Sequence, residues 1–278
     1  MMLIRKEKNI HTFVEIIKDH MQYKQQIFKL AKADLLKTYR GAALGWAWAI
    51  IKPAVTIFVY WFAFQIGVKT EKAIEGFPFF LWLIAGLIPW FYINDMLIHG
   101  TEAIRKYSYL VTKMKFPIST IPTFVSISKL MVNLFLIVIM ILIFAFMGYS
   151  PDIYLIQLPI YILLSFIFFT IFSLFTSLLA CMSKDFANLR KSLVTAVFWL
   201  SGIVWNVNTI DSQWLKILLK VNPVTYLVEG FRNCFIHKVW IWENPKTLLC
   251  FFIILAILTV LAVILYKKLR KEIPDVLN

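Results

Sequence analysis

The sequence has few charged residues, few cysteines and none of the common motifs for nucleotide or metal chemistry. Only 16% of its 278 residues are charged and 60% are hydrophobic, which excludes a water-soluble globular protein. Its cysteines, Cys181, Cys234 and Cys250, have no metal-binding spacing, so we expect them to be packing residues. The chain contains no Walker-type phosphate loop, no H-E-x-x-H and no G-x-S-x-G. The sequence therefore predicts no catalytic residues, cofactor or metal in this chain, and any ATP would be bound by another chain.

Long hydrophobic runs are abundant, and six of them could each cross about 30 Å of hydrocarbon as a helix. The sequence thus predicts an all-α integral membrane protein, with one transmembrane domain over residues 42–278. Residues 211–246 differ, because their apolar stretches are short and broken by polar residues. We expect this part to be re-entrant or interfacial and to pack against the other helices. The predicted spans are residues 42–66, 77–98, 118–147, 153–182, 192–210 and 247–266.

Residues 1–41 are polar and basic, and they lack the apolar run of a signal peptide, so we expect the N-terminus to be retained. Two sets of apolar residues recur at helical spacing with lysines between them. This pattern predicts two amphipathic helices that lie at the surface of an anionic leaflet. A solvated helix packed on another protein domain is the alternative. The two sets are Ile10, Phe13, Ile17 and Met21, then Phe28, Ala31, Leu35 and Tyr39.

The distribution of lysine and arginine predicts the orientation. With six spans, the two termini and the segments 99–117 and 183–191 share one side, which carries twenty of these residues, whereas the other side carries seven. The positive-inside rule places both termini and those two segments in the cytoplasm. Membrane topology therefore accounts for the net charge of +14, and the sequence predicts no nucleic-acid partner.

The segment 99–117 contains an amphipathic turn. Its apolar side is expected to be formed by Ile104, by Tyr107 or Ser108, and by Leu110 or Val111, before Phe116-Pro117 ends the helix. A short helix on the cytoplasmic face can transmit a push from a protein that grips it. The run Ser183-Lys184-Asp185-Phe186 is a smaller candidate. The alternative is that both segments are loops whose positive charge only sets the topology.

Lys52 lies ten residues into the first predicted span, where an ionisable side chain is costly. Trp48 and Thr56 lie one turn away on either side, and Tyr60 and Phe64 continue the same stripe. A cation among aromatic residues suits a phosphate or a sugar, whereas the alternative is a lysine that snorkels to the headgroups. Lys129 is expected to snorkel. Asp95 and His99 could pair, but the chain has few groups for a proton relay.

Three passages resemble the permeases of type-2 ABC exporters for polysaccharides. DLLKTYRGAALGWAWAIIKP, from Asp34 to Pro53, is similar to the entry into their first span. GLIPWFYINDMLIHGTEAIRKYSYLVTKMKFP, from Gly86 to Pro117, resembles their second span and coupling helix, and NPVTYLVEGFR, from Asn222 to Arg232, their extracellular re-entrant segment. The tracts VYWFAFQIGV and KMKFP make the chain most similar to teichoic acid translocation permeases of Gram-positive bacteria.

This resemblance implies a permease in the bacterial plasma membrane that exports undecaprenyl-diphosphate-linked wall teichoic acid. It implies a homodimer above two ATPase subunits that bind Mg-ATP. Another lipid-linked polymer, such as O-antigen or capsule, is the alternative, and an ion-coupled transporter or a membrane glycosyl- or phosphotransferase is further from the pattern. The expected coupling residues are Arg105, Lys106, Tyr109, Lys113, Lys115, Lys184 and Asp185. The expected substrate path is Lys52, Trp48, Tyr60, Phe64 and Trp90, and the outer gate is Asn222, Pro223, Tyr226, Glu229 and Arg232.

Overall fold

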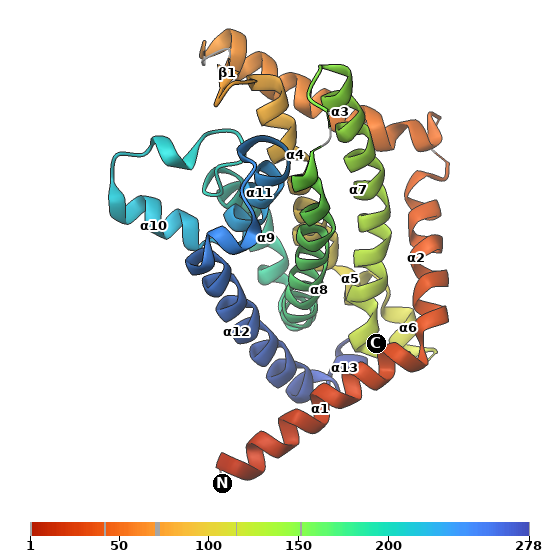
Figure 1. The fold of residues 1–278 in the computed structure, drawn as a ribbon. Coiled ribbons are helices and arrows are strands. Elements are labelled where there is room, and N and C mark those ends of the chain that lie inside the picture. The colour runs from red at the N-terminus through yellow and green to blue at the C-terminus, as the bar shows by residue number, and fades with distance from the viewer. Residues whose placement is uncertain (1, 42, 70–72, 115, 151, 278) are drawn as a thin grey trace.

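The computed structural model describes residues 2–41, 43–69, 73–114, 116–150 and 152–277, without the side chains of residues 2–10, 184, 187–189 and 191. It is a bundle of long helices (Figure 1). The first half contains α1 (Met2–Gln22), α2 (Lys24–Tyr39), η1 (Gly45–Ala47), α3 (Trp48–Phe62), η2 (Ala63–Gly67), the hairpin β1 (Ala73–Ile74) and β2 (Phe77–Pro78), α4 (Phe79–Asp95), η3 (Met96–Gly100), α5 (Ala103–Lys106) and α6 (Ser108–Thr112).

The second half carries three long helices and a group of short ones. Helices α1 and α13 lie in the lower part of the view, with α13 beside α6, and the β-hairpin lies at the upper end (Figure 1). The elements are η4 (Ile118–Thr120), α7 (Ile121–Phe146), η5 (Ile153–Gln157), α8 (Leu158–Met182), α9 (Lys184–Trp199), η6 (Val207–Thr209), α10 (Gln213–Val221), α11 (Pro223–Arg232), η7 (Asn233–His237), η8 (Ile241–Glu243), α12 (Pro245–Leu269) and α13 (Ile273–Leu277).

Five helical segments of the described chain are long and apolar enough to cross a membrane, and they coincide with five of the six predicted spans. They differ in how much of their surface the protein itself covers. Most of the segment Phe79–Gly100 is buried, whereas Gly45–Gly67 and Pro245–Leu269 are largely exposed. The segment Phe79–Gly100 is therefore the centre of the bundle, and the other two present apolar faces outward. All five are Gly45–Gly67, Phe79–Gly100, Ile118–Phe146, Ile153–Met182 and Pro245–Leu269.

The prediction of a single helix over residues 192–210 is wrong. The helix α9 begins earlier, at Lys184, so it includes most of the segment that was expected to be a cytoplasmic loop, and it ends at Trp199. Its 16 residues span about 24 Å at 1.5 Å per residue. Beyond it the chain turns at Gly202, whose φ of +61° favours glycine. The apolar run continues past this point because the turn is buried inside the protein.

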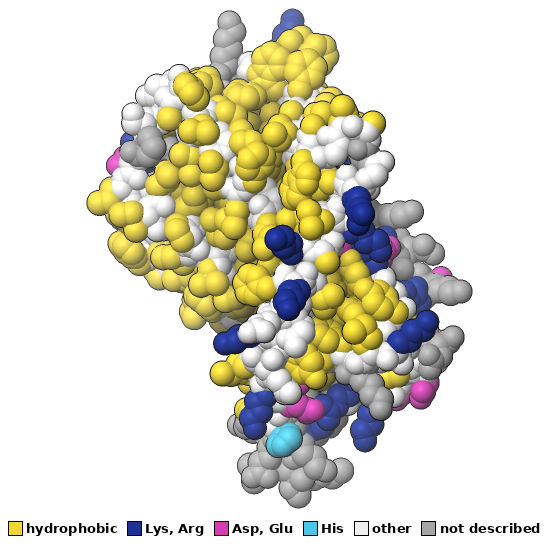
Figure 2. Space-filling view, turned by 90° about the vertical axis from the view of Figure 1, so that its right-hand side faces the viewer, with side chains coloured by type: hydrophobic (Ala, Val, Ile, Leu, Met, Phe, Trp, Pro, Cys, Tyr) yellow, Lys and Arg dark blue, Asp and Glu magenta, His cyan; other side chains and the backbone are white. Residues whose placement is uncertain are grey.

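The predicted pair of N-terminal helices is present as α1 and α2, and α2 packs along α7. The buried stripe of α2 differs from the predicted one. It consists of Ile27, Ala31 and Asp34, whereas Phe28 is 60% exposed. In Figure 2 the upper part of this side of the molecule is mostly hydrophobic, and most of the lysine and arginine side chains lie below it. This distribution is typical of a protein whose basic segments lie beside an apolar membrane band.

The core of the bundle forms around α4, which is apolar on all sides and packs against α7 and α11. Leu81, Trp82, Leu83, Ile84 and Ala85 are each at most 1% exposed. The predicted packing of residues 211–246 against the other helices is confirmed for α11, because this helix buries its apolar face on α4 and α8. The central helix thus contacts both the long helices and the short polar segment.

Arg232 is fully buried where α11 meets α4. Its guanidinium lies 3.5 Å from the centre of the Trp82 ring, and it donates to the backbone carbonyls of Gly202 and Ile203 at 2.8 and 2.7 Å. Gly86 makes room for it, because a Cβ atom at this position would lie 2.5 Å from Nη2 of Arg232 and 2.7 Å from the Ile203 carbonyl oxygen. The packing of α4, α11 and the turn after α9 therefore depends on the absence of a side chain at position 86.

Gly86→Ala should lower the free energy of unfolding by about 1–3 kcal/mol, because the added methyl group overlaps buried atoms that have no room to shift. Thermal unfolding of the purified protein in detergent measures the effect. Gly67→Ala is the matched control, because no atom lies within 4 Å of the added Cβ there. Equal unfolding temperatures for the two variants would show that Arg232 can move without cost.

Candidate functional site

Four of the five residues predicted for a substrate path line one pocket of about 370 Å³. Trp48, Lys52 and Tyr60 come from α3, and Trp90 comes from α4. Helices α4 and α7 complete the wall with the polar side chains of Asn94, Asp95, Lys129 and Asn133. We call this site the inner pocket. Phe64 is not part of it, because one further turn of the chain places its ring against Phe79, with 6.3 Å between the ring centres.

The inner pocket has an excess of positive charge. Lys129 is only 7% exposed, and its Nζ lies 3.9 Å from Oδ2 of Asp95, so the prediction that it snorkels to the headgroups is wrong. Lys52 is exposed, and its Nζ lies 5.8 Å from the centre of the Trp48 ring. Among the described residues, no carboxylate forms an ion pair with Lys52. Two lysines against one aspartate leave a cation available to an anionic ligand.

Aromatic rings form much of the wall of the inner pocket. Phe198 of α9 holds two of them, with its ring centre 5.1 Å from that of Tyr60 and 5.3 Å from that of Trp90. Tyr39 at the end of α2 also lines the pocket, and its ring is stacked on that of Trp46, with ring centres 5.0 Å apart. Rings with fixed faces can pack on the apolar side of a sugar, while the nearby amides and lysines bind its polar groups.

The predicted coupling segment folds as two short helices, α5 and α6, and its buried side is the one expected from the sequence. Ile104, Tyr107, Leu110 and Val111 are all buried. The outward side carries Lys106, Tyr109, Lys113 and Met114 exposed, and Arg105 half-buried. Lys115 lies outside the described residues, as does the side chain of Lys184, and Asp185 is exposed at the start of α9. The segment thus has a basic and aromatic outer surface.

Asp34 joins α2 to this coupling segment, and the sequence analysis gave it no role. Its carboxylate is buried, accepts a hydrogen bond of 2.9 Å from Nζ of Lys106, and accepts another from the Tyr107 hydroxyl. Burial raises the pKa of Asp34, but these hydrogen bonds outweigh burial and lower it, so the group stays ionised. Ile27, Ala31 and Asp34 lie on one face of α2. An acidic residue in line with apolar ones is therefore the sequence feature from which the role of Asp34 could have been predicted.

The coupling segment is also tied to α9. Arg190 pairs with Glu102 just before α5, and its Nη1 donates to the Ile98 carbonyl at 2.8 Å. Arg105 donates to the Cys181 carbonyl at the end of α8. A displacement of α5 would therefore reach α2 through Asp34 and α9 through Arg190.

The predicted outer gate residues lie together on α11. Asn222 caps the helix by accepting from the Val224 N–H at 2.9 Å and donates to the Ser201 hydroxyl, and Pro223 is the first helical residue. One turn further on, Tyr226 and Glu229 line a second pocket of about 290 Å³, which we call the outer pocket.

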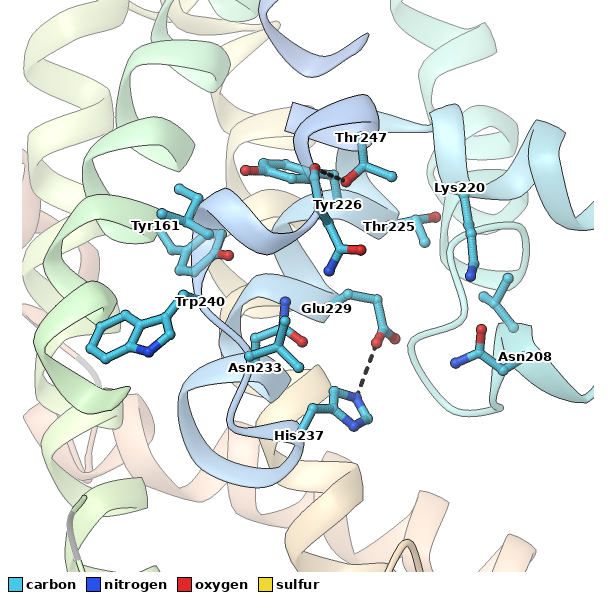
Figure 3. Close-up of a pocket in the computed structure, with 14 residues that line it drawn as sticks. Tyr161, Asn208, Lys220, Thr225, Tyr226, Glu229, Asn233, His237, Trp240 and Thr247 are labelled. Atoms are coloured by element: carbon cyan, nitrogen blue, oxygen red, sulfur yellow. Dashed lines mark hydrogen bonds and ion pairs between the residues drawn. The ribbon is translucent and has the colours of Figure 1, made fainter. Parts of the chain in front are cut away.

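Four charged side chains contact one another in sequence and link α11 and η7 to the β-hairpin. Arg232 donates to Oε1 of Glu229 at 2.7 Å. Nε2 of His237 lies 3.2 Å from Oε2 of the same carboxylate, and Figure 3 shows this contact. Nδ1 of His237 contacts the carboxylate of Glu75 in the β-hairpin turn. The sequence carries no local signal for either His237 or Glu75, because the two residues are far apart along the chain and belong to different elements.

Both ring nitrogens of His237 face carboxylates, so the protonated ring, with two N–H donors, matches this site better than the neutral ring. Burial lowers the pKa of His237, but Glu229 and Glu75 outweigh burial and raise it. Burial likewise raises the pKa of Glu229, but Arg232 and His237 reverse this and hold it well below its usual range. Arg232 and His237 thus balance the carboxylates of Glu229 and Glu75, and these four side chains join α11 to the β-hairpin.

Comparison with known proteins identifies relatives over most of the chain. Residues 25–236 match the family described as ABC-2 type transporter. An O-antigen export system permease protein of Myxococcus xanthus is 22% identical over 264 residues, which cover 94% of this chain and 99% of the relative. An O-antigen export system permease protein of Klebsiella pneumoniae is 23% identical over 252 residues, which cover 89% of this chain and 93% of the relative.

The stability of the protein should fall as pH rises through the raised pKa of His237, because the protonated ring joins Glu75 to Glu229 and its deprotonation removes both contacts. The stabilisation is complete below the ordinary histidine pKa of 6.5 and is lost progressively as pH rises from there through the raised pKa. Thermal unfolding in detergent between about pH 6 and about pH 9 measures this slope.

His237→Gln should flatten that part of the profile. His11→Gln, at an exposed position of α1, should leave it unchanged. A slope that survives in His237→Gln would assign the pH dependence to another group.

Proposed function

The chain belongs to the ABC-2 type transporter family, and on this premise we propose that it is the permease subunit of an ATP-driven exporter of a lipid-linked polysaccharide. The observation that carries the proposal is the inner pocket. It combines an exposed lysine with aromatic walls. Helices α2 and α9 contact these walls and are also bound to the coupling segment or to the residues just before it. A phosphate and an attached sugar are the ligand groups that this combination suits.

The relatives favour a polymer of the O-antigen type over wall teichoic acid. The sequence alone placed the chain nearer to teichoic acid permeases, and the two relatives described above are both named as O-antigen export permeases. They support the alternative interpretation of the sequence better than the main one. Analysis of the surface polymers of cells depleted of this protein separates the two, because only the exported polymer should disappear from the outer face.

The transport step needs an energy source, because a charged polymer cannot cross about 30 Å of hydrocarbon unaided. In the proposed complex two copies of this chain form a homodimer above two separate ATPase subunits, which bind Mg-ATP. Both termini and the coupling segment would face the cytoplasm, as the lysine and arginine content of residues 1–41 and 99–117 favours. Closure of the ATPases would push α5 and α6, and α2 and α9 would pass this motion to the inner pocket through Tyr39 and Phe198.

The coupling segment should be the part of this chain that holds the ATPase. Tyr109→Ala combined with Lys113→Glu changes two exposed residues and leaves the buried side of α5 and α6 intact. We expect recovery of the ATPase with the tagged permease to fall about tenfold or more, as for the loss of a central contact. Mass spectrometry of the proteins purified from native membranes measures it.

Lys216→Glu on α10, far from the coupling segment, is the control and should retain the ATPase. If the tagged wild-type permease is recovered without an ATPase, the proposed function is wrong. If the wild-type permease recovers the ATPase and the double variant recovers it equally well, the ATPase binds elsewhere on the permease.

Lys52 should bind the anionic part of the substrate. Lys52→Met removes the charge and keeps much of the side-chain length. Half-maximal stimulation of ATP hydrolysis by purified lipid-linked polysaccharide should then need about tenfold more polymer, as for the loss of a hydrogen bond to a charged group. Lys246→Met, at the exposed start of α12, is the matched control. An identical response of the two variants would return Lys52 to a role in anchoring the helix at the headgroups.

A further inference from the structure

The outer pocket lies at the opposite end of the bundle from the coupling segment. It is formed by α11 and η7 on one side and by η6, the end of α10 and the start of α12 on the other. Figure 3 shows Lys220, Asn208 and Thr225 on one side of Glu229, and Trp240, Tyr161 and Asn233 on the other. Its volume of about 290 Å³ is at the lower end of the range for small-molecule sites, so a ligand about the size of one sugar ring would fill it.

The lining of the outer pocket is polar, and most of its charged groups are paired with one another. Glu229 is bound by both Arg232 and His237, and His237 also contacts Glu75, which leaves Lys220 as the lining cation without an ion pair among the described residues. An anionic ligand beside Lys220 would also meet the ionised carboxylate of Glu229, which disfavours a phosphate in this pocket. Side chains that can both donate and accept hydrogen bonds supply most of the remaining polar groups: Asn208, Asn233, Asn244 and Thr247.

Several hydrogen-bonding groups of the outer pocket are not used by the protein itself. Among the described residues, the buried Thr225 hydroxyl has no hydrogen-bond partner. Asn208 and Asn244 are exposed to the pocket. Buried polar groups are normally paired, so an unpaired hydroxyl beside free amides indicates room for a polar ligand.

Aromatic rings provide a flat and fixed wall. Trp240 is stacked on Trp242, with ring centres 4.8 Å apart and planes 7° from parallel, and it also contacts Tyr154. Tyr226 is held by Phe251 at 4.8 Å between ring centres. A pyranose ring has an apolar C–H face that packs on such rings and hydroxyl groups that need amide partners at its edge.

We propose that the outer pocket binds an uncharged sugar unit of the exported polymer. This inference rests on the proposed function, because it takes the polymer to be a polysaccharide. The two pockets then bind chemically different parts of the substrate. The inner pocket binds the anionic end of the chain, and the outer pocket binds a neutral ring that has reached the far end of the bundle.

Saturation-transfer NMR on the purified full-length permease in nanodiscs tests the proposal without the ATPase. The probes are methyl hexopyranosides of glucose, galactose, mannose and N-acetylglucosamine, with inorganic phosphate as the competing anion. We expect at least one glycoside to bind saturably and phosphate not to displace it. Asn208→Ala and Asn244→Ala should each raise its dissociation constant about fivefold, as for the loss of one hydrogen bond.

Two control variants separate the outer pocket from its surroundings. Gln213→Ala removes an amide from the exposed start of α10, and Lys216→Met removes a charge from the same helix, and neither residue lines the pocket. Both should bind the glycoside as wild type does, whereas Lys220→Met should weaken it only slightly. Thermal unfolding confirms that each variant is folded.

The inference is overturned if no glycoside saturates, if the pocket variants bind like the controls, or if phosphate displaces the sugar. Because this assay contains no ATPase, its failure leaves the recovery of an ATPase with the permease as a separate result. Conversely, glycoside binding by a permease that recovers no ATPase would retain the site and reject the transporter.

Discussion

The burial of one guanidinium, that of Arg232, is the constraint on which the outer half of the structure depends. Arginine keeps its charge inside a protein, so its N–H groups need acceptors or an aromatic face. Here Glu229 and the carbonyls of Gly202 and Ile203 accept from the two terminal nitrogens, and the guanidinium lies over the ring of Trp82, whereas Nε has no hydrogen-bond partner among the described residues. This single group therefore ends α9 at a turn, holds α11 against α4, and requires that position 86 has no side chain.

A second buried ionic group organises the opposite end. Asp34 holds α2 to the coupling segment through Lys106 and Tyr107, and the chain runs from α2 through the stacked pair of Tyr39 and Trp46 into the inner pocket. Packed elements of this kind move as units, because the interior of a protein is too dense to deform continuously. A push on α5 would thus be felt at Trp48 and Lys52 without any direct contact between the two sites.

The two pockets differ in the way that a charged glycolipid differs along its length. The inner pocket has an exposed lysine among aromatic rings, and the outer pocket has amides, an unpaired threonine hydroxyl and a carboxylate that stays ionised. Because the favourable energy of a phosphate contact and that of a sugar contact arise from different groups, a carrier that separates them binds each end of its substrate in a suitable environment.

The sequence by itself determined the all-α membrane fold, five of the spans, the two N-terminal helices and the buried side of the coupling segment, because hydrophobic periodicity reports directly which faces leave water. It also brought Trp48, Lys52 and Tyr60 onto one helix. Only the tertiary structure decided that α9 stops at Trp199, that Lys129 pairs with Asp95, and that His237 joins Glu229 to Glu75. Those outcomes depend on partners from distant segments, and a local pattern carries no information about which polar group will satisfy another once both are buried.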